Sequence, residues 1–316
     1  PRAPTGEARP DPNPGWPMLD DRLTEQRNPR SRGIDALSPV EFVDLINRED
    51  RTVPVAGGEE RENIARAAEL ALEAFRSGGR LIYVGAGTSG RLGVLDAAEM
   101  PPTFGTDPIM VQGVIAGGYD ALVKAQEGAE DYPEAGAAEM DLRMVCENDF
   151  VLGIATSGST PFVHGALARA RELGARTGFL LCTQPSEALV ETHDVVIAPL
   201  VGPEVITGST RMKAGTATKL VLNSITTSAM VLMGKVLSNL MVDLQVTCLK
   251  LEDRGQRILR TLLDMTEDEA RDLLHHSGGN VKTAIVMRSL DVDRLTARAL
   301  LEGADGRVVD VVGELE

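Results

Sequence analysis

Two segments of the chain place glycine and hydroxyl side chains directly after a short apolar run. They read GAGTSG at 85–90 and TSGSTP at 156–161, and each precedes a segment with the pattern of a helix. Glycine lets the backbone approach a ligand closely. Hydroxyl groups and the free N–H groups at a helix start form an anion site. Two such turns in one sheet therefore predict a sugar phosphate that is bound from two sides.

A third polar segment, at 199–213, leads into a long helical pattern. Arg211 and Lys213 bring positive charge to the start of that helix, where charge-assisted hydrogen bonds to an anion are strong. A loop that is merely solvated is the alternative interpretation. The segment is not a P-loop, because the pattern GxxxxGK[ST] is absent from it.

The first turn also matches GxGxxG, the pattern of a dinucleotide-binding turn. That function needs an acidic side chain about 20 residues further on, at the end of the second strand, to bind a ribose. The predicted second strand ends in GVIAGG, with Asp107 before it and Asp120 after it. The hydroxyls of Thr88 and Ser89 also favour a single phosphate or a sugar. We therefore do not expect a nicotinamide cofactor.

Two carboxylates have positions from which they could do acid–base chemistry. Glu99 ends a predicted helix at 88–99 whose start faces the ligand, and Pro101 and Pro102 are expected to stop that helix. Glu127 lies at a helix end that glycine interrupts. Most glutamates in such places are simply solvated. Taken alone, the residues leave both interpretations open.

Composition excludes several classes of function. The 316 residues carry 47 acidic and 32 basic side chains, a net charge of −15, which disfavours binding to nucleic acid or to an anionic membrane. Three scattered cysteines and four histidines lack the spacing of a disulfide framework or a metal site, so we expect no metal. No apolar run reaches the roughly 18 residues of a membrane span, and no signal peptide opens the chain. A reduced cytoplasmic location is expected.

Strand and helix patterns alternate over the middle of the chain. Strands are predicted at 80–84, 109–115, 149–154, 177–182 and 194–198, with helices at 60–77, 88–99 and 161–173 and helical segments across 119–143. This alternation predicts an α/β fold, a parallel sheet with helices on both faces. Ligands of such sheets bind beyond the carboxyl ends of the strands, where both hydroxyl turns lie.

Composition changes toward both ends of the chain. Residues 1–21 are rich in proline, and we expect there a disordered tail or an arm that drapes over a partner. A long helical pattern covers 214–250, and three short helices are predicted beyond it, with a start at Thr266 and a break at Gly278. The predicted units are therefore the tail at 1–21, an α/β domain with an N-terminal arm at 22–254, and a helical domain at 255–316.

Several blocks of residues together resemble the N-acetylmuramic acid 6-phosphate etherase family. They are LTE at 23–25, GAGTSGRL at 85–92, LDAAEMPPT at 95–103, EGAED at 127–131 and GSTRMKAGT at 208–216. The similarity covers roughly residues 22–316. It implies a SIS (sugar isomerase) domain, a small helical domain like a ubiquitin-associated bundle, a homodimer, and a role in the recycling of cell-wall amino sugars.

The resemblance also implies a reaction. Such an etherase cleaves the D-lactyl ether at C3 of the sugar, by elimination and then addition of water, to give N-acetylglucosamine 6-phosphate and D-lactate. By resemblance, Glu127 is the base that removes the C2 proton, and Glu99 is the acid toward lactate and then the base toward water. Two carboxyl groups suffice, so no metal and no cofactor is expected.

The same resemblance implies the residues that bind substrate. The phosphate would lie mainly on the second turn, and the loop at 199–213 would close over the sugar and the lactyl carboxylate. The implied residues are Ser157, Ser159 and Thr160, then Thr88 and Ser89 from the first turn, and Glu204, Ser209, Arg211 and Lys213 from the loop. Many etherases have Ser-Gly-Arg-Thr-Pro where this chain has Ser at 159, so a guanidinium near the phosphate is missing or comes from elsewhere.

The position of Glu99 raises a question of reach. In one straight helix it would lie about 15 Å from Ser89, at about 1.5 Å per residue, which is longer than a hexose phosphate. Either the helix is broken, or Glu99 serves the site of a neighbouring subunit, and we favour the second.

Two alternative functions are open to the chain. One is a sugar-phosphate sensor like glucokinase regulatory protein, which has two SIS domains, and the other is an aldose–ketose isomerase. The blocks around Glu99 and Glu127 favour the etherase.

Overall fold

The structure is a computed structural model that describes residues 22–243 and 249–313. The predicted tail at 1–21 lies outside the described residues. Among the described residues, no helix is both long and apolar enough to cross a membrane.

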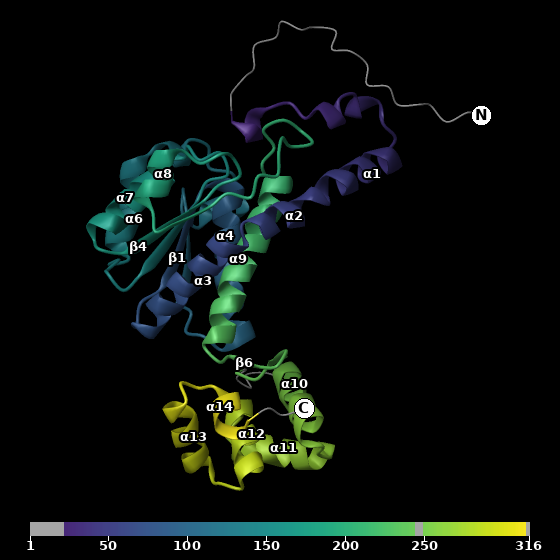
Figure 1. Cartoon of the computed structure of the whole chain (residues 1–316), viewed down its shortest axis with the longest axis vertical. Coiled ribbons are helices and arrows are strands. Elements are labelled where there is room, and N and C mark those ends of the chain that lie inside the picture. The colour runs from purple at the N-terminus through teal and green to yellow at the C-terminus, as the bar shows by residue number, and fades with distance from the viewer. Residues whose placement is uncertain (1–21, 244–248, 314–316) are drawn as a thin grey trace, which may run out of the picture.

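A parallel sheet of five strands forms the middle layer of the larger part of the molecule (Figure 1). Its strand order is β2-β1-β3-β4-β5, and every neighbouring pair is parallel. The strands are β1 (Leu81–Gly85), β2 (Val111–Ile115), β3 (Phe150–Ile154), β4 (Arg176–Leu180) and β5 (Val195–Ile197). The five predicted strands are confirmed, with ends that differ by one or two residues.

Helices cover both faces of the sheet because alternate strand residues point to opposite sides. Leu81 and Tyr83 face one hydrophobic core, and Ile82 and Val84 face the other. The first core includes residues of α3 (Arg61–Arg76), α4 (Gly87–Phe104) and α9 (Lys213–Leu232), and the second includes residues of α6 (Pro133–Leu142) and α7 (Pro161–Glu172). Three shorter elements occur between these helices along the chain. They are α5 (Asp120–Val123), the 3-10 turn η4 (Ala129–Asp131) and α8 (Glu187–Thr192).

The helices that follow β1 and β3 lie on opposite faces of the sheet. These strands are neighbours in the sheet, yet α4 leaves β1 toward one face and α7 leaves β3 toward the other. In an open α/β sheet, the crevice at such a switch point is where ligands bind. The fold therefore places both hydroxyl turns beside that crevice.

Helix α4 extends further than predicted. It runs to Phe104, with Pro101 and Pro102 inside its last turn, so the prediction that these prolines stop the helix is wrong. Their rings remove N–H groups that would bond to preceding carbonyls, but burial of Met100 and Phe104 in the core favours the extra turn. Gly105, at φ +63°, then ends the helix and donates its N–H to the carbonyl of Pro101. The helix is continuous at Glu99, and the alternative of a broken helix is wrong.

The predicted helix at 214–250 is two helices separated by a hairpin. Helix α9 ends at Leu232, and Gly234 follows with φ +71°, a conformation that suits glycine and interrupts a helix. Two short antiparallel strands, β6 (Val236–Leu237) and β7 (Leu240–Met241), form the hairpin. The apolar pattern continues through this region, and for that reason the sequence indicated one helix.

The C-terminal part of the chain packs around a hydrophobic core of its own, below the sheet domain in Figure 1. Its helices are α10 (Leu249–Leu263), α11 (Glu267–His276), α12 (Val281–Leu290), α13 (Arg294–Gly303) and α14 (Val308–Val312). Three helices were predicted here and five are described. Thr266 caps α11 in a capping box, as its predicted helix start requires. The predicted boundary between residues 254 and 255 falls within α10.

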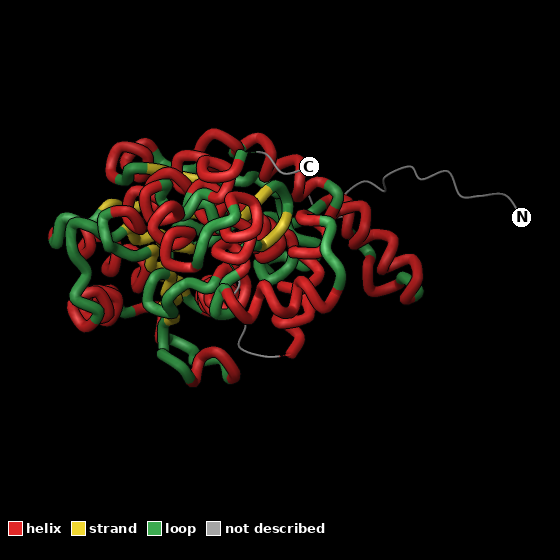
Figure 2. Tube along the Cα trace, turned by 90° about the horizontal axis from the view of Figure 1, so that it is seen from below, coloured by secondary structure: helices red, strands yellow, loops and turns green. Residues whose placement is uncertain are grey.

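An N-terminal arm leads from Arg22 to two helices beside the sheet domain. The arm contains the short 3-10 turns η1 (Leu23–Glu25), η2 (Pro29–Ser31) and η3 (Ile34–Ala36), followed by α1 (Pro39–Asp50) and α2 (Thr52–Glu59). Figures 1 and 2 both show α1 projecting away from the body of the molecule. The arm passes over the carboxyl ends of the strands, where the N–H of Leu23 donates to the Oγ1 atom of Thr183 at 3.3 Å.

Candidate active site

The two hydroxyl turns lie side by side at one edge of the sheet. Gly85, the last residue of β1, pairs with Ile154, the last residue of β3, so the turns at 86–90 and 155–160 leave neighbouring strand ends. Close packing requires glycine at position 90, because a Cβ atom there would lie 2.6 Å from the Cγ1 atom of Ile115. The structure thus brings together the two turns that the sequence singled out.

The second turn gathers its hydroxyl groups in front of α7. The Oγ atoms of Ser157 and Ser159 are 3.0 Å apart, and the N–H of Ser159 donates to Ser157 Oγ at 3.4 Å. Thr160 is the N-cap residue of α7, so its hydroxyl lies at the start of that helix. The positive end of the helix dipole and three hydroxyl groups therefore occur together, as an anion site requires.

The first turn lies against the start of α9. Thr88 and Ser89 belong to the first turn of α4. A Cβ atom on Gly215 would lie 3.6 Å from the Cγ2 atom of Thr88 and 3.4 Å from the carbonyl oxygen of Thr210. The first turn, the loop at 199–213 and the start of α9 therefore meet at one place.

Glu204 is buried and holds the start of α9. Its carboxylate accepts hydrogen bonds at 2.9 Å from the backbone N–H groups of both Lys213 and Ala214. Burial raises the pKa of the Glu204 carboxyl, and these two N–H donors oppose the rise. The predicted contact of Glu204 with substrate is replaced in this structure by bonds to two N–H groups that would otherwise lack an acceptor.

Lys213 is also buried, with an exposed fraction of 0%. Its ammonium group donates at 2.9 Å to the carboxylate of Glu49 and at 2.9 Å to the carbonyl oxygen of Val201. Lys213 was predicted to close over the lactyl carboxylate, and the structure instead directs its charge into the interior. Ser209, half-buried, and Arg211, exposed, are the predicted loop residues that remain at the surface.

Glu49 is the centre of this buried cluster. Its carboxylate accepts hydrogen bonds from Arg30, from Lys213 and, at 2.7 Å, from the side-chain amide of Asn28. The bond from Arg30 is the largest cause that lowers the pKa of Glu49 to about 2; burial opposes it, and the bonds from Lys213 and Asn28 add to it. The cluster joins the N-terminal arm, the end of α1 and the loop that precedes α9.

Glu127 lies at the same edge of the sheet as the hydroxyl turns. It is exposed, in the turn that precedes η4. This turn packs beside Gly117, two residues beyond the end of β2, because a Cβ atom on Gly117 would lie 2.9 Å from Gln126 Cβ and 3.3 Å from Ala129 Cβ. Since β2 is the neighbour of β1 in the sheet, the turn places Glu127 near the carboxyl ends of the strands.

Glu99 lies elsewhere, on the outer side of α4. It lines a cavity of about 200 Å³ between α4 and α9, together with Leu95, Asp96, Lys219 and Asn223. At about 1.5 Å per residue, the helix carries it roughly 18 Å from Gly87. The structure therefore does not bring Glu99 to the hydroxyl turns of the same chain.

Asp96 is a buried carboxyl group in the cavity of Glu99, one helical turn before it. It accepts hydrogen bonds from the Tyr83 hydroxyl at 3.0 Å and from the Asn223 amide at 2.7 Å. Burial raises the pKa of Asp96, and these hydrogen bonds oppose the rise. Tyr83 comes from strand β1 and Asn223 from helix α9, so only the fold brings these two partners to Asp96.

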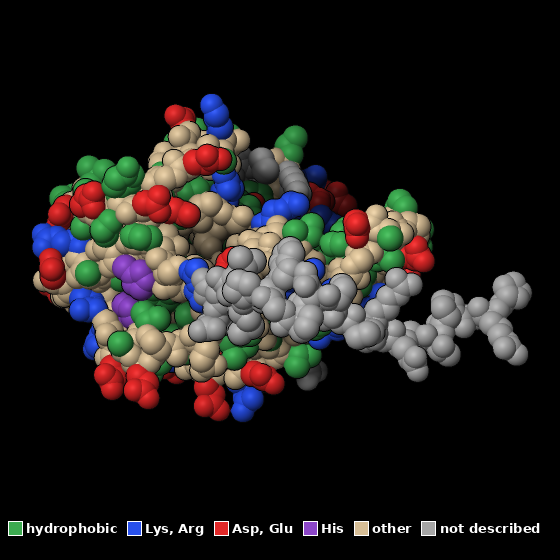
Figure 3. Space-filling model, turned by 90° about the horizontal axis from the view of Figure 1, so that it is seen from above, with side chains coloured by type: hydrophobic (Ala, Val, Ile, Leu, Met, Phe, Trp, Pro, Cys, Tyr) green, Lys and Arg blue, Asp and Glu red, His purple; other side chains and the backbone are tan. Residues whose placement is uncertain are grey.

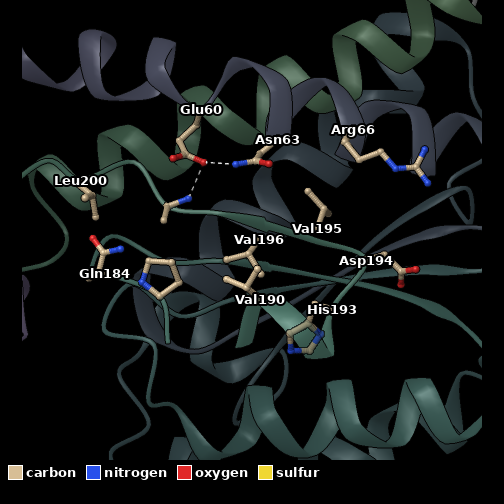
Figure 4. A pocket seen from close by; sticks show the side chains of 12 residues that line it. Glu60, Asn63, Arg66, Gln184, Val190, His193, Asp194, Val195, Val196 and Leu200 are labelled. Atoms are coloured by element: carbon tan, nitrogen blue, oxygen red, sulfur yellow. Dashed lines mark hydrogen bonds between the residues drawn. The ribbon is translucent and has the colours of Figure 1, made fainter. Parts of the chain in front are cut away.

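A larger cavity, of about 330 Å³, lies by the edge strand β5 (Figure 4). Above it, the Glu60 carboxylate accepts hydrogen bonds from Asn63 at 2.8 Å and from the N–H of Ala198 at 3.1 Å. Burial, with a smaller contribution from Arg171, lowers the pKa of the lining residue His193 to about 4. The residues that line this cavity differ from all those predicted from the sequence.

One further residue at the hydroxyl turns was missed by the sequence analysis. The guanidinium of Arg22 donates a hydrogen bond of 2.6 Å to the Oγ atom of Ser159, from 137 positions away along the chain. The departure at Ser159 was the available signal, since it raised the question of a guanidinium from elsewhere. Figure 3 looks down on this edge of the molecule and shows a shallow hollow among uncharged side chains, with both basic and acidic side chains around it.

Known proteins resemble the chain over most of its length. The model of the glucokinase regulatory protein N-terminal SIS domain matches residues 63–171. A protein of Salinibacter ruber is 53% identical over 300 residues, which cover 95% of this chain and 96% of the relative. One of Rippkaea orientalis is 49% identical over 290 residues, with 92% and 94% covered. Both relatives are named N-acetylmuramic acid 6-phosphate etherase.

One solved structure aligns with part of the chain. A phosphoheptose isomerase of Neisseria gonorrhoeae aligns with a TM-score of 0.46 and 18% identity, over 60% of this chain and 97% of that one. The predicted SIS-type α/β fold, followed by a small helical bundle, is confirmed. Given the identity of about half its residues to full-length relatives, the chain belongs to the N-acetylmuramic acid 6-phosphate etherase family.

Proposed function

We propose that this etherase uses Glu127 and Glu99 as its acid–base pair. The substrate is N-acetylmuramic acid 6-phosphate, and the products are N-acetylglucosamine 6-phosphate and D-lactate. Family membership at 53% identity over 95% of the chain carries this proposal. The position of the hydroxyl turns at the switch point of the sheet supports it, since ligands of such sheets bind there.

The first half of the reaction is an elimination. In the ring-opened sugar, the C1 aldehyde makes the C2 proton acidic. Glu127 accepts that proton, a double bond forms between C2 and C3, and the C3–O bond breaks. Glu99 donates a proton to the departing lactate oxygen. Each positioned acid or base contributes about 10²- to 10⁴-fold to the rate.

The second half is the addition of water across the double bond. Glu99, now a carboxylate, accepts a proton from water as the oxygen attacks C3. Glu127 returns its proton to C2, and both carboxyl groups regain their starting forms. Electrons and protons balance without an oxidant or a metal, so the two side chains can perform both steps.

The phosphate is bound by the hydroxyl turns in this proposal. Ser157, Ser159 and Thr160 approach it from the second turn, together with the first N–H groups of α7. Thr88 and Ser89 approach from the first turn. The short distance between Ser157 Oγ and Ser159 Oγ, 3.0 Å, supports a shared ligand oxygen, because both hydroxyls can donate to it.

The loop at 199–213 has two parts in this proposal. Ser209 and Arg211, which lie at the surface, face the sugar and the lactyl carboxylate. Glu204 and Lys213 position them from the interior, through the bonds to the start of α9 and to Glu49.

We also propose a homodimer in which Glu99 serves the site of the partner subunit. Glu99 is exposed within a continuous helix, away from the hydroxyl turns of its own subunit. Beside it, the Leu95 side chain is 51% exposed, and a second copy would cover this apolar side chain.

The cytoplasmic location that the cysteine pattern indicated stays a prediction.

The test is release of D-lactate from N-acetylmuramic acid 6-phosphate by the purified full chain. An etherase releases lactate and N-acetylglucosamine 6-phosphate in equal amounts. A sensor would bind the substrate without releasing lactate, and an aldose–ketose isomerase would also release none. Folded protein that binds the substrate and releases no D-lactate would therefore refute the proposed function.

A further inference from the structure

We propose that Arg22, from the N-terminal arm, supplies the guanidinium that binds the phosphate of the substrate. This inference rests on the proposed function of the second hydroxyl turn as the phosphate site. It assigns a binding residue that neither hydroxyl turn contains, and it gives the N-terminal arm a part in recognition of the substrate.

The contact between Arg22 and Ser159 is the first observation. The Nη1 atom of Arg22 lies 2.6 Å from Ser159 Oγ, and this oxygen lies 3.0 Å from Ser157 Oγ. The guanidinium therefore reaches the pair of hydroxyl groups in front of α7. A phosphate oxygen that accepts from these hydroxyls would lie within hydrogen-bond reach of the same guanidinium.

The arm that follows Arg22 is attached at several points to the rest of the molecule. Leu23 donates its N–H to Thr183, three residues beyond the end of β4. Thr24 is 1% exposed, and its carbonyl oxygen accepts from the N–H of Gly208 at 3.2 Å. The side-chain amide of Asn28 donates to Glu49 and to the carbonyl oxygen of Pro203. These bonds fix the backbone next to Arg22 at the carboxyl ends of the strands.

The negative charge of the phosphate is the reason why a cation is needed at the second hydroxyl turn. Neither turn, at 86–90 or at 155–160, contains Lys or Arg, and the whole chain has a net charge of −15. A phosphate dianion in such a protein is stabilised by a nearby positive charge more than by hydroxyl dipoles alone. Guanidinium is suited to this because its planar fork can donate two parallel hydrogen bonds to phosphate.

Steady-state kinetics of Arg22→Ala test the proposal. We expect KM for N-acetylmuramic acid 6-phosphate to rise about tenfold while kcat stays within about twofold, because a contact made equally in ground and transition states changes KM alone. The KM of Arg22→Lys should lie between those of the wild type and Arg22→Ala, because lysine keeps the positive charge but lacks the planar guanidinium group. Arg27→Ala is the matched control, because it removes an exposed arginine from the same arm.

Moving the guanidinium from position 22 to position 159 tests whether Arg22 binds the phosphate or only stabilises the arm. Ser159→Arg in the Arg22→Ala background restores a guanidinium to the second turn without restoring the arm contact. We expect KM to return to within about threefold of the wild type, given that a charge-assisted contact is regained. A KM of Arg22→Ala within about twofold of both wild type and Arg27→Ala would overturn the proposal.

Calorimetry with N-acetylglucosamine 6-phosphate distinguishes this inference from the proposed function. We expect Arg22→Ala to bind this sugar phosphate about tenfold more weakly than Arg27→Ala does, as loss of a charged contact predicts. If the wild type releases no D-lactate and this difference is still found, the proposed function fails and the inference stands. If lactate is released and the two variants bind equally, the inference fails and the function stands.

Discussion

Lys213 and Glu49 form a buried ion pair across 164 positions of the chain, with Lys213 Nζ 2.9 Å from Glu49 Oε2. Their side chains are 0% and 3% exposed. The pair joins the end of α1 to the start of α9, and Arg30 and Asn28 attach the N-terminal arm to the same carboxylate. One buried carboxylate thus holds three segments that border the proposed site.

Replacement of Glu49 tests how much this cluster stabilises the fold. Glu49→Gln leaves the charges of Lys213 and Arg30 without their counter-ion, so we expect unfolding free energy to fall by roughly 3–5 kcal/mol. Glu69→Gln is the control, because it removes an exposed ion pair with Arg66 and should cost less than about 1 kcal/mol. Urea unfolding measures both. Equal stability of the two variants would contradict a stabilising role for the cluster.

Acid should remove the contribution of Glu49 to stability. Its pKa is lowered from 4.5 to about 2 in the folded chain, so the native state favours the carboxylate. The contribution is complete above pH 4.5 and is lost as the pH falls toward about 2. The difference in unfolding free energy between wild type and Glu49→Gln should therefore shrink from pH 5 to pH 3. A difference that stays constant over this range would contradict the lowered pKa.

His193 should remain neutral well below the ordinary pKa of histidine. Burial lowers its pKa from 6.5 to about 4, and the Thr177 hydroxyl lies 3.0 Å from its Nδ1 atom. The native state thus favours the neutral ring, whose contribution to stability is complete above pH 6.5 and is lost as the pH falls toward 4. Titration of the imidazole by NMR should give a midpoint near 4. A midpoint near 6.5 would show that the ring is solvated.

Mixing two inactive variants tests whether subunits share their sites. If each site takes Glu99 from one subunit and Glu127 from the other, refolding Glu99→Gln together with Glu127→Gln gives mixed dimers with one intact site. Random pairing in a twofold dimer should restore about a quarter of wild-type activity. A mixture of Glu99→Gln with Glu99→Ala is the control and should stay inactive. Absence of restoration in the first mixture would show that sites are not shared.

Local patterns predicted most of the fold. Each strand of the sheet is a short apolar run that ends in glycine or a polar turn, as at Gly85, and alternation with helices then indicated a parallel sheet. The hairpin at 236–241 was missed because the apolar pattern continues from α9 through it. The length of α4 was missed because burial of Phe104 outweighs a local rule about proline.

The site was predictable only where its residues occur close together in sequence. Each hydroxyl turn holds the residues that we propose to bind phosphate within six consecutive positions, and the strand register places the two turns side by side. The burial of Lys213 depends on Glu49, and the contact of Ser159 depends on Arg22; these partners are 164 and 137 positions away. Local pattern cannot indicate such pairs, because the fold alone brings them together.

Hydrogen exchange at C2 of the substrate tests the acid–base pair most directly. In deuterated water with N-acetylmuramic acid 6-phosphate, Glu99→Gln should still exchange the C2 proton for deuterium and should release no D-lactate, because proton removal precedes loss of the leaving group. Glu127→Gln should do neither, while the nearby Glu130→Gln should behave as wild type. Release of D-lactate by Glu99→Gln or by Glu127→Gln at the wild-type rate would contradict the roles proposed for these two residues.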